Sequence, residues 1–361
     1  MALPTPNNVA DITASWIEEG LRTGNVIADA HVSGVKLRPI GDGQGFLSRV
    51  AVVDVEYERP APGAPASVVV KLEPAAGAFR DAERESKAFE REVRFYRQVA
   101  GHVAARVPHF YYAICSPEGS ALILEDLSHL RCGDQVRGMR HSEVLATVRQ
   151  IARLHAAFWN NEQLASLDWL PDHDQFWTQD FAENWPGFAR EYEVRVGSEG
   201  LAIGDRMLRH LDWLKQRIAE RPSTLIHADL RADNLMFGAP DTEDASVILD
   251  WQLATKSMAA IDPTRLFGGS EPASQRTGHH MEVFAAWHET LIGAGVKNYE
   301  FDEALTDFRL GALYNLLVPV KAFGFLAGFS EVRASRLLDA ATERLFTSAI
   351  ELDARSLLPD S

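Results

Sequence analysis

The sequence contains only two cysteines, Cys115 and Cys132, among its 361 residues. Two thiols can build neither a disulfide framework nor a four-cysteine zinc site, and this sparing use of cysteine favours a reducing cytoplasm. A basic surplus is also missing, because 36 Lys and Arg oppose 51 Asp and Glu, which gives a net charge of −15. Broad binding to nucleic acid or to an anionic membrane is therefore disfavoured, since it needs cations that neutralise phosphates. A local basic site for one small anion stays open.

No long, uninterrupted hydrophobic run occurs. The most apolar stretch, residues 310–329, is broken by Asn315, Pro319 and Lys321, which is typical of a buried helix pair rather than of a membrane span. The first residues carry neither a basic segment nor an apolar core, so no secretion signal is expected.

Several common motifs are absent as well. The sequence has no G-x-x-x-x-G-K-[ST], no H-E-x-x-H and no G-x-S-x-G. The glycines of residues 41–45 resemble a dinucleotide-binding turn, but such a turn follows a strand and opens a helix. Here a strand pattern follows the glycines, and this interpretation fails.

What is present indicates an α+β protein. The length allows two domains, or one large unit of two lobes. A small antiparallel sheet with one long helix is expected in residues 1–127, and a larger, mainly helical part in residues 128–361, with the boundary just after Leu127. Alternation and helical periodicity predict strands at 46–58, 67–72, 109–115, 121–127, 224–226 and 247–249, and helices at 11–21, 82–100 and 141–160.

The segment 225–235 carries the chemistry. A short apolar strand leads into His-x-Asp, ending at Asp229, and Asn234 follows five residues later; Asp250 ends another short apolar strand. Phosphoryl transfer from ATP needs a group that accepts the hydroxyl proton, which Asp229 could be. It also needs oxygen ligands for Mg²⁺, for which Asn234 and Asp250 are candidates. The third need is a cation on the phosphates, and Lys71 at the end of the second predicted strand is the candidate.

Glu92 could hold the Lys71 ammonium in place. It lies one helical turn from both Phe89 and Tyr96, at the inner edge of the apolar stripe of its helix. The competing carboxylates are Glu83, Glu85 and Glu90.

These segments together resemble a known group. LIHADLRADNLMF, VILDWQ, VVVKLEP with EREVRFYR, and ALILEDL occur in the linear order of the aminoglycoside-phosphotransferase and choline-kinase superfamily, over roughly residues 41–267. Within this superfamily, the sequence pattern is most similar to the ecdysteroid-kinase-like branch. The resemblance implies a protein-kinase-like fold of two lobes, with a nucleotide-covering sheet in the first lobe and the catalytic loop, metal site and acceptor pocket in the second.

The resemblance also implies roles for single residues. Asp229 would be the catalytic base, and Asn234 and Asp250 the metal ligands. Lys71 and Glu92 would form the ion pair that positions the phosphates.

A hinge is implied as well. The backbone of Glu125 and Leu127 would meet the adenine of ATP, and Gly43 and Gly45 would lie over its phosphates. The sequence departs from the protein-kinase pattern G-x-G-x-x-G in this turn, which reads G-x-G-x-G and is followed by Phe46.

Other departures and side chains leave alternatives. Ala228 stands where many relatives have glycine, and Arg231 stands where protein kinases carry a lysine that touches the transferred phosphate; a plain surface arginine is an equal alternative. His227 is expected to hold the loop and His155 to lie in the core. Asp262 is a candidate helix cap. For the remaining histidines a solvated helix face is favoured over a metal site: His279, His280 and His288.

The sequence thus predicts an ATP- and Mg²⁺-dependent kinase of a hydroxylated small molecule, with a nucleotide-binding pseudokinase as the alternative. The net charge would suit a cationic acceptor, whereas the aromatic segments 176–192 and 310–329 would suit an apolar one. We predict that these segments, with Trp177 and Tyr314, wall the acceptor site and that the acceptor is substantially apolar. The oligomeric state stays open.

Overall fold

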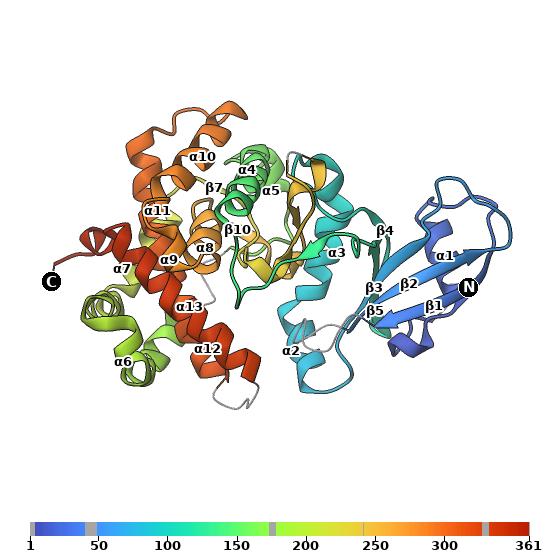
Figure 1. The fold of residues 1–361 in the computed structure, drawn as a ribbon, viewed down its shortest axis with the longest axis horizontal. Coiled ribbons are helices and arrows are strands. Elements are labelled where there is room, and N and C mark those ends of the chain that lie inside the picture. The colour runs from blue at the N-terminus through green and yellow to red at the C-terminus, as the bar shows by residue number, and fades with distance from the viewer. Residues whose placement is uncertain (1–3, 40–48, 173–177, 241, 327–331, 361) are drawn as a thin grey trace. The chain divides into compact units, whose positions relative to one another are not determined.

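The computed structural model describes residues 4–39, 49–172, 178–240, 242–326 and 332–360 (Figure 1). The chain forms two compact units. The first unit comprises Met1–His102, Val107–Arg131 and Leu249–Leu253, and the second comprises Val103–Arg106, Cys132–Ile248 and Ala254–Ser361. The short segment with Asp250 therefore belongs to the first unit, although it lies far along the chain. The single boundary after Leu127 stays a prediction.

An antiparallel sheet of five strands forms the frame of the first unit, in the order β1-β2-β3-β5-β4. Four of the strands match those predicted from the alternation of apolar residues. The strand β1 was not predicted, because it is an edge strand whose outward positions carry Lys36 and Arg38 and whose pattern Gly34 dilutes. The strands are β1 (Val32–Pro39), β2 (Arg49–Tyr57), β3 (Ser67–Leu72), β4 (Phe110–Ser116) and β5 (Gly119–Glu125).

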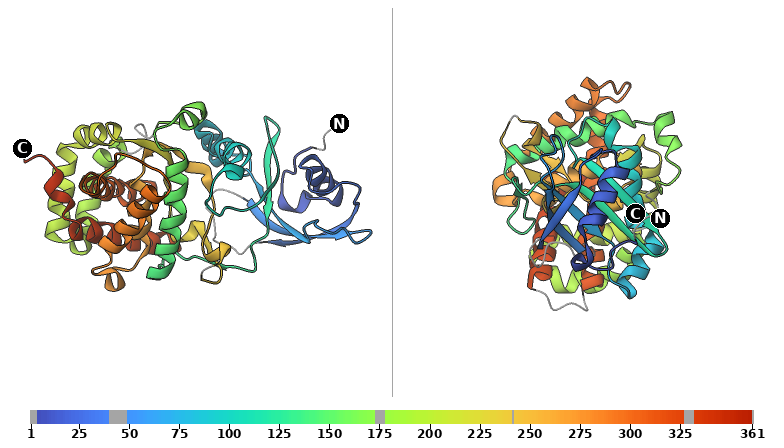
Figure 2. Two further views of the ribbon diagram at one scale, coloured as in Figure 1. Left: turned by 90° about the horizontal axis from the view of Figure 1, so that it is seen from above. Right: turned by 90° about the vertical axis from the view of Figure 1, so that its right-hand side faces the viewer.

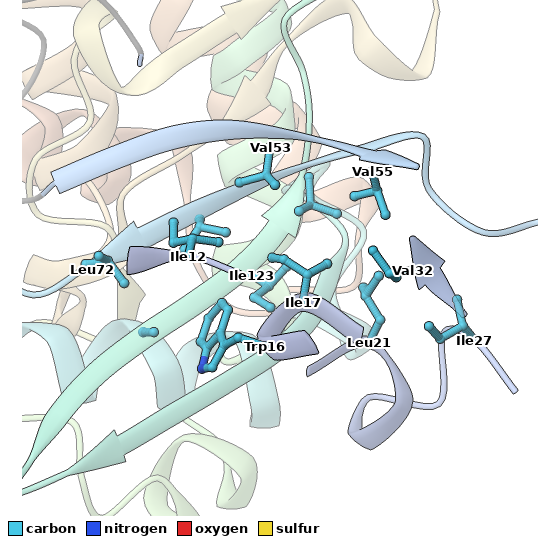
Figure 3. Close-up of a cluster of buried hydrophobic side chains, with 13 residues drawn as sticks. Ile12, Trp16, Ile17, Leu21, Ile27, Val32, Val53, Val55, Leu72 and Ile123 are labelled. Carbon is cyan, nitrogen blue, oxygen red and sulfur yellow. The ribbon is translucent and has the colours of Figure 1, made fainter. Parts of the chain in front are cut away.

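The helix α1 (Ala14–Thr23) covers one face of this sheet (Figure 3). Thr13 caps this helix, since its hydroxyl accepts the Trp16 N–H at 3.2 Å. Trp16 and its apolar neighbours on α1 are buried against valines and isoleucines of the sheet. This core holds β3 rigidly, and β3 carries Lys71.

The other face of the sheet receives α3 (Figure 2). Because successive side chains of a strand point to opposite faces, Val70 and Leu72 face α1, whereas Lys71 points toward α3. One helix was predicted over residues 82–100, and this prediction is wrong. The chain forms α2 (Ala78–Ser86) and α3 (Ala88–Gln98), which are separated by Lys87 in the left-handed conformation at φ 55°.

The second unit is mainly helical. The apolar stretch 310–329 contributes to the pair α11 and α12, as predicted, and among the described residues no helix is long and apolar enough to cross a membrane. The helix α13 packs against α6, α8 and α12. The helices are α4 (His141–Ala157), α5 (Glu162–Ser166), α6 (Thr178–Arg209), α7 (Leu211–Ala219), α8 (Ile261–Ser270), α9 (Ala273–Arg276), α10 (His280–Gly293), α11 (Phe301–Asn315), α12 (Leu317–Leu326) and α13 (Val332–Glu351).

Two short antiparallel ladders lie among these helices. The strand β7 (Ser223–Ile226) pairs with β10 (Thr255–Met258), and β8 (Leu235–Phe237) pairs with β9 (Val247–Ile248). The strand β6 (Arg131–Cys132) extends the second ladder through Gly133, whose N–H donates to the Leu235 carbonyl. Between β7 and β8 runs the loop with His-x-Asp, so both of its ends are anchored in strands.

Candidate functional site

Lys71 lies between two carboxylates of the first unit. Its Nζ atom is 2.7 Å from Glu92 Oε2 and 3.0 Å from Asp250 Oδ1. We call Lys71, Glu92 and Asp250 the lysine centre. Each comes from a different element: Lys71 from β3, Glu92 from α3, and Asp250 from the segment that follows β9. The structure thus brings together three residues that the sequence had singled out.

The electrostatics of the lysine centre favour a charged lysine. Burial would lower the pKa of Lys71, but the carboxylates of Asp250 and Glu92 outweigh burial and raise this pKa. Burial raises the pKa of Glu92 to about 7, although the Lys71 ammonium opposes the shift. The competitor Glu83 has another partner, because its carboxylate accepts the backbone N–H of Phe89. Glu90 accepts a bond from Arg94 at 2.8 Å.

The segment after Asp250 is fixed to α3. The Trp251 ring stacks on Phe95 with the ring centres 3.8 Å apart, and Arg91 donates to the Gln252 carbonyl at 2.7 Å. Asp250 itself has a positive φ of 61°, a conformation that aspartate tolerates better than most residues. Its side chain is 40 % exposed. A fixed backbone and an accessible carboxylate suit a ligand for a cation.

Asp229 forms the matching centre of the second unit. Its Oδ2 lies 3.0 Å from Arg231 Nε, and its Oδ1 lies 3.0 Å from Arg265 NH2. Asn234 Nδ2 donates to the Asp229 carbonyl at 2.9 Å and to Oδ2 at 3.2 Å. We call these four residues, Asp229, Arg231, Asn234 and Arg265, the aspartate centre.

Two guanidinium groups keep Asp229 ionised. Burial would raise its pKa, but Arg231 and Arg265, with help from His227, outweigh burial and lower the pKa below the usual range of aspartate. Arg231 also contacts Asp233 at 2.6 Å, and its side chain is only 22 % exposed, unlike that of a surface arginine. The charge pattern therefore suits a carboxylate that stays ready to accept a hydrogen bond from a hydroxyl.

Arg265 was missed in the sequence. It lies on α8 and is buried, and its pKa is lowered, chiefly by burial. Among the described residues, its Nε and NH1 atoms have no hydrogen-bond partner. The only signal in the sequence is its position three residues after Asp262, nearly one helical turn along α8.

Asp262 holds the loop of the aspartate centre. Its carboxylate accepts the backbone N–H groups of His227 at 2.7 Å and of Ala228 at 2.9 Å, and it contacts His155 Nε2 at 3.1 Å. The predicted capping role is wrong, because the N-cap of α8 is Ala260 and it makes no side-chain bond. His227 Nδ1 accepts the Asp229 N–H at 3.2 Å, and His155 is fully buried.

Ala228 adopts a backbone conformation that favours glycine. Its φ is 65°, in the left-handed region, which costs an L-residue with a Cβ roughly 1–2 kcal/mol and costs glycine nothing. Asp262 holds this backbone conformation, because it accepts the N–H groups of His227 and of Ala228.

The remaining predicted site residues are placed as follows. Glu125 ends β5, and its N–H donates to the His109 carbonyl at 2.9 Å. Leu127 is buried within the first unit. Gly43 and Gly45 lie outside the described residues. The role of this segment toward adenine stays a prediction.

A cavity of about 330 Å³ in the second unit contains Tyr314. Its lining mixes apolar side chains such as Met258 and Leu317 with Lys256, and it includes no residue of the aspartate centre. The amide nitrogen of the neighbouring Asn315 donates to the Ile261 and Gly311 carbonyls and to Thr264.

The other predicted wall is partly core. The rings of Phe181, Trp185, Phe188 and Phe346 pack on one another inside the second unit. Phe176 and Trp177 lie outside the described residues.

Solved structures share this architecture. A choline kinase from Cryptosporidium parvum is similar with a TM-score of 0.58 at 12 % identity, over 95 % of this chain and 98 % of that one. A microcompartment-associated aminopropanol kinase gives 0.53 at 14 %, over 94 % and 98 %. An ethanolamine kinase of Plasmodium vivax gives 0.50 at 12 %, over 87 % and 81 %. At these identities the likeness establishes the fold, which is the protein-kinase-like fold of small-molecule kinases.

The family follows from the sequence model that matches. Residues 42–297, more than half of the chain, match the ecdysteroid kinase-like family, and the protein belongs to this family. No curated protein matches the chain. The predicted superfamily and the predicted fold class are both confirmed.

Proposed function

We propose that this protein transfers the γ-phosphate of ATP to a hydroxyl group of a small molecule, in a Mg²⁺-dependent reaction. The observation that carries the proposal is the lysine centre, a buried ammonium fixed 2.7 Å and 3.0 Å from two carboxylates. Kinases of this fold use such a lysine to hold the phosphates of ATP. The fold and the family support small-molecule phosphotransfer.

The lysine centre would prepare a place for the nucleotide. A lysine that keeps its charge when buried can bind phosphate oxygens without changing its protonation state. Glu92 holds the ammonium from the α3 side, so its orientation is set before the nucleotide arrives. When ATP binds, its phosphates would compete with Asp250 for the ammonium, and Asp250 would be released to a cation.

The oxygen donors fit Mg²⁺. Asp250 offers an accessible carboxylate. The amide nitrogen of Asn234 makes both bonds to Asp229, and no described residue donates a hydrogen bond to its Oδ1. Carboxylate and amide oxygens beside phosphate are the donors that Mg²⁺ prefers. The bound ion would neutralise charge that develops on the phosphates.

Asp229 would orient the acceptor. An ionised carboxylate accepts a hydrogen bond from the attacking hydroxyl and takes its proton as the new P–O bond forms and the bond to ADP breaks. Arg231 donates to Oδ2 and Arg265 donates to Oδ1 of this carboxylate. Each bond limits the directions from which the hydroxyl can approach that oxygen. Each guanidinium would also favour the negative charge of the transferred phosphate.

For the acceptor we propose a hydroxylated, substantially apolar molecule. The cavity at Tyr314 lies at the Ser223–Met258 end of the β7–β10 ladder, and the chain reaches His227 only after the length of β7, about 13 Å. Only an elongated acceptor could span this length. Tyr314→Ala should then raise the KM for the acceptor more than the KM for ATP, and an equal effect on both would exclude the cavity.

The test is ADP production by the full-length protein with Mg·ATP and a panel of acceptors. The panel contains steroid alcohols, choline, ethanolamine, aminopropanol and aminoglycosides, and the Asp229→Asn variant measures the background. Turnover with one class above this background supports the proposal and identifies the acceptor class. Nucleotide binding in a thermal-shift assay without turnover on any acceptor would instead favour the pseudokinase alternative.

A further inference from the structure

Three helix ends of the second unit bring two imidazole rings to one carboxylate, outside both centres described above. His141 is the first residue of α4, Glu271 follows α8, and His279 precedes α10. His141 Nδ1 lies 3.2 Å from one oxygen of Glu271, and His279 Nδ1 lies 3.0 Å from the other. One atom from each residue lies within 4.8 Å of the other two. His279, for which a solvated helix face was expected, is partly exposed and also contacts the buried Glu271.

The carboxylate of Glu271 is fully buried. A buried charge is costly unless an opposite charge or a metal ion compensates it. The nearby Arg276 does not do so, because its guanidinium contacts the Glu351 carboxylate at 2.9 Å and the Glu271 carbonyl oxygen at 3.1 Å. Among the described residues, the two imidazoles are the only hydrogen-bond partners of the Glu271 carboxylate.

A second carboxylate, that of Glu282, faces the other side of His141. His141 Nε2 lies 3.1 Å from Glu282 Oε2, while His141 Nδ1 faces Glu271. A neutral imidazole has one N–H and cannot donate to two carboxylates. Metal sites resolve this conflict, since a histidine that binds a metal through one nitrogen commonly donates its other N–H to a carboxylate.

The charges favour the same arrangement. Two carboxylates give the cluster a charge of −2 when the imidazoles are neutral, which a divalent cation would balance. Two imidazolium ions would balance it as well, but the His141 and His279 ring centres lie only 3.8 Å apart, so their charges would repel each other. A cation among neutral rings avoids this repulsion.

We propose that His141, Glu271 and His279 bind a divalent transition-metal ion, with Zn²⁺ as the best fit, and that Glu282 positions His141. Two imidazole nitrogens and one carboxylate oxygen, with water in a fourth position, are a common zinc donor set. Ligand distances of about 2.0–2.1 Å on a tetrahedral ion place neighbouring donors a little more than 3 Å apart. His279 Nδ1 lies 3.0 Å from Oε1 of Glu271 and His141 Nδ1 lies 3.2 Å from Oε2, so each nitrogen is close to that distance from one of the two carboxylate oxygens. Mg²⁺ prefers oxygen donors and would not compete.

Such an ion would join the beginning of α4 to the junction of α8 and α10. To test this, the full-length protein is freed of metal with a chelator and kept in excess Mg²⁺, which occupies oxygen-donor sites. Calorimetric titration with Zn²⁺ should show about one equivalent bound, and Zn²⁺ should raise the melting temperature. Co²⁺ in its place should give the visible absorption of a tetrahedral nitrogen–oxygen site.

Variants assign the binding to this cluster. His141→Ala and His279→Ala should each lower Zn²⁺ affinity at least about tenfold, and Glu282→Gln should lower it about 10–100-fold as the loss of an orienting partner. The matched control is His288→Ala. His288 lies on α10, and its imidazole contacts the Tyr299 carbonyl instead of the cluster, so this variant should bind Zn²⁺ like the wild type. His141 and His279 are partly exposed, so their replacement should leave the fold intact, which circular dichroism verifies.

Two results would overturn the proposal. One is a wild-type protein without saturable Zn²⁺ binding and without a change in melting temperature. The other is a folded His279→Ala variant that keeps the affinity and the Co²⁺ spectrum of the wild type. In either case the cluster is a hydrogen-bonded network of imidazoles and carboxylates and holds no metal.

Discussion

The lysine centre and the aspartate centre are electrostatic opposites. In the first, one ammonium lies between two carboxylates; in the second, one carboxylate lies between two guanidinium groups. In both centres burial works against the charge of the central group, and in both the two partners outweigh burial. Each unit thus keeps a partly buried charge, positive on Lys71 and negative on Asp229.

The difference lies in the partners. The partners in the aspartate centre are arginines, which stay protonated at any relevant pH, whereas one partner of Lys71 is Glu92, with a pKa of about 7. The aspartate centre should therefore change its charge only in acid. The lysine centre should respond to pH near neutrality. The predictions below test this contrast, from the largest expected effect to the smallest.

The largest effect is expected at the central carboxylate. Asp229→Asn keeps the shape of the side chain but removes the proton acceptor and the charge that orients the hydroxyl. We expect kcat to fall about 10²–10⁴-fold, with Mg·ATP binding nearly unchanged. Steady-state kinetics with the acceptor found in the panel and a binding titration with nucleotide measure the two quantities. A variant that keeps more than about half of the wild-type kcat shows that Asp229 is not the base.

The next effect concerns the cation that Asp250 would bind. Asp250→Ala should lower nucleotide affinity and kcat together, by about 10²-fold in kcat/KM, because the ion that bridges the phosphates is lost. Asn234→Ala should act in the same direction but more mildly, since a neutral amide attracts the ion less. The matched control is Asp54→Ala, a carboxylate of the same unit that pairs with Arg38 on the sheet. Unchanged Mg²⁺ dependence in both site variants would exclude these ligands.

How far the sequence predicts these centres follows from what holds each residue. Lys71 and Glu92 could be paired in advance, because the period of a strand and the period of a helix each place one side chain on a defined face. Asp229, Asn234 and Asp250 were visible through their spacing after short apolar strands. These local patterns also predicted four of the five strands of the sheet.

The features that the sequence does not reveal depend on tertiary structure. Arg265 reaches Asp229 only because the loop with His227 and Ala228 packs against α8, where Asp262 holds it, and no local period indicates that contact. The break at Lys87 was equally hidden, since no glycine or proline marks it and only the backbone conformation changes. His141 and Glu271 lie 130 residues apart and meet through the packing of helix ends.

A smaller effect is expected at Arg265. Arg265→Met removes one of the two guanidinium groups that lower the pKa of Asp229, so this pKa should rise. A carboxylate with a lowered pKa contributes stability above its unfolded pKa of about 3.9, and that stability is lost as the pH falls through the folded value. Because the pKa of Asp229 rises in the variant, both this loss of stability and the acid limb of the kcat/KM profile should move to higher pH.

At neutral pH the Arg265→Met variant should lose about 10–100-fold in kcat/KM, which corresponds to one charge-assisted hydrogen bond. Arg265→Lys keeps a cation and serves as the matched control, which should restore part of the profile. If the acid limb of the methionine variant coincides with that of the wild type while kcat falls, Arg265 does not act through the ionisation of Asp229.

The smallest effect separates the two centres by pH. Glu92→Gln keeps an oxygen that accepts the Lys71 hydrogen bond but removes the charge, so the KM for ATP should rise only about threefold to tenfold at pH 8. In the wild type the same loss should appear as the pH falls through about 7, because the Glu92 carboxylate then takes up a proton. The stability contribution of Glu92 runs the other way: a raised pKa favours the folded state below the unfolded value of about 4.3, and this contribution is lost as the pH rises through 7. The measurement is the KM for ATP between pH 6 and pH 8 in both proteins. The wild type should show a step near pH 7 and the glutamine variant should show none, whereas a step of equal size in both would place the titrating group outside the lysine centre.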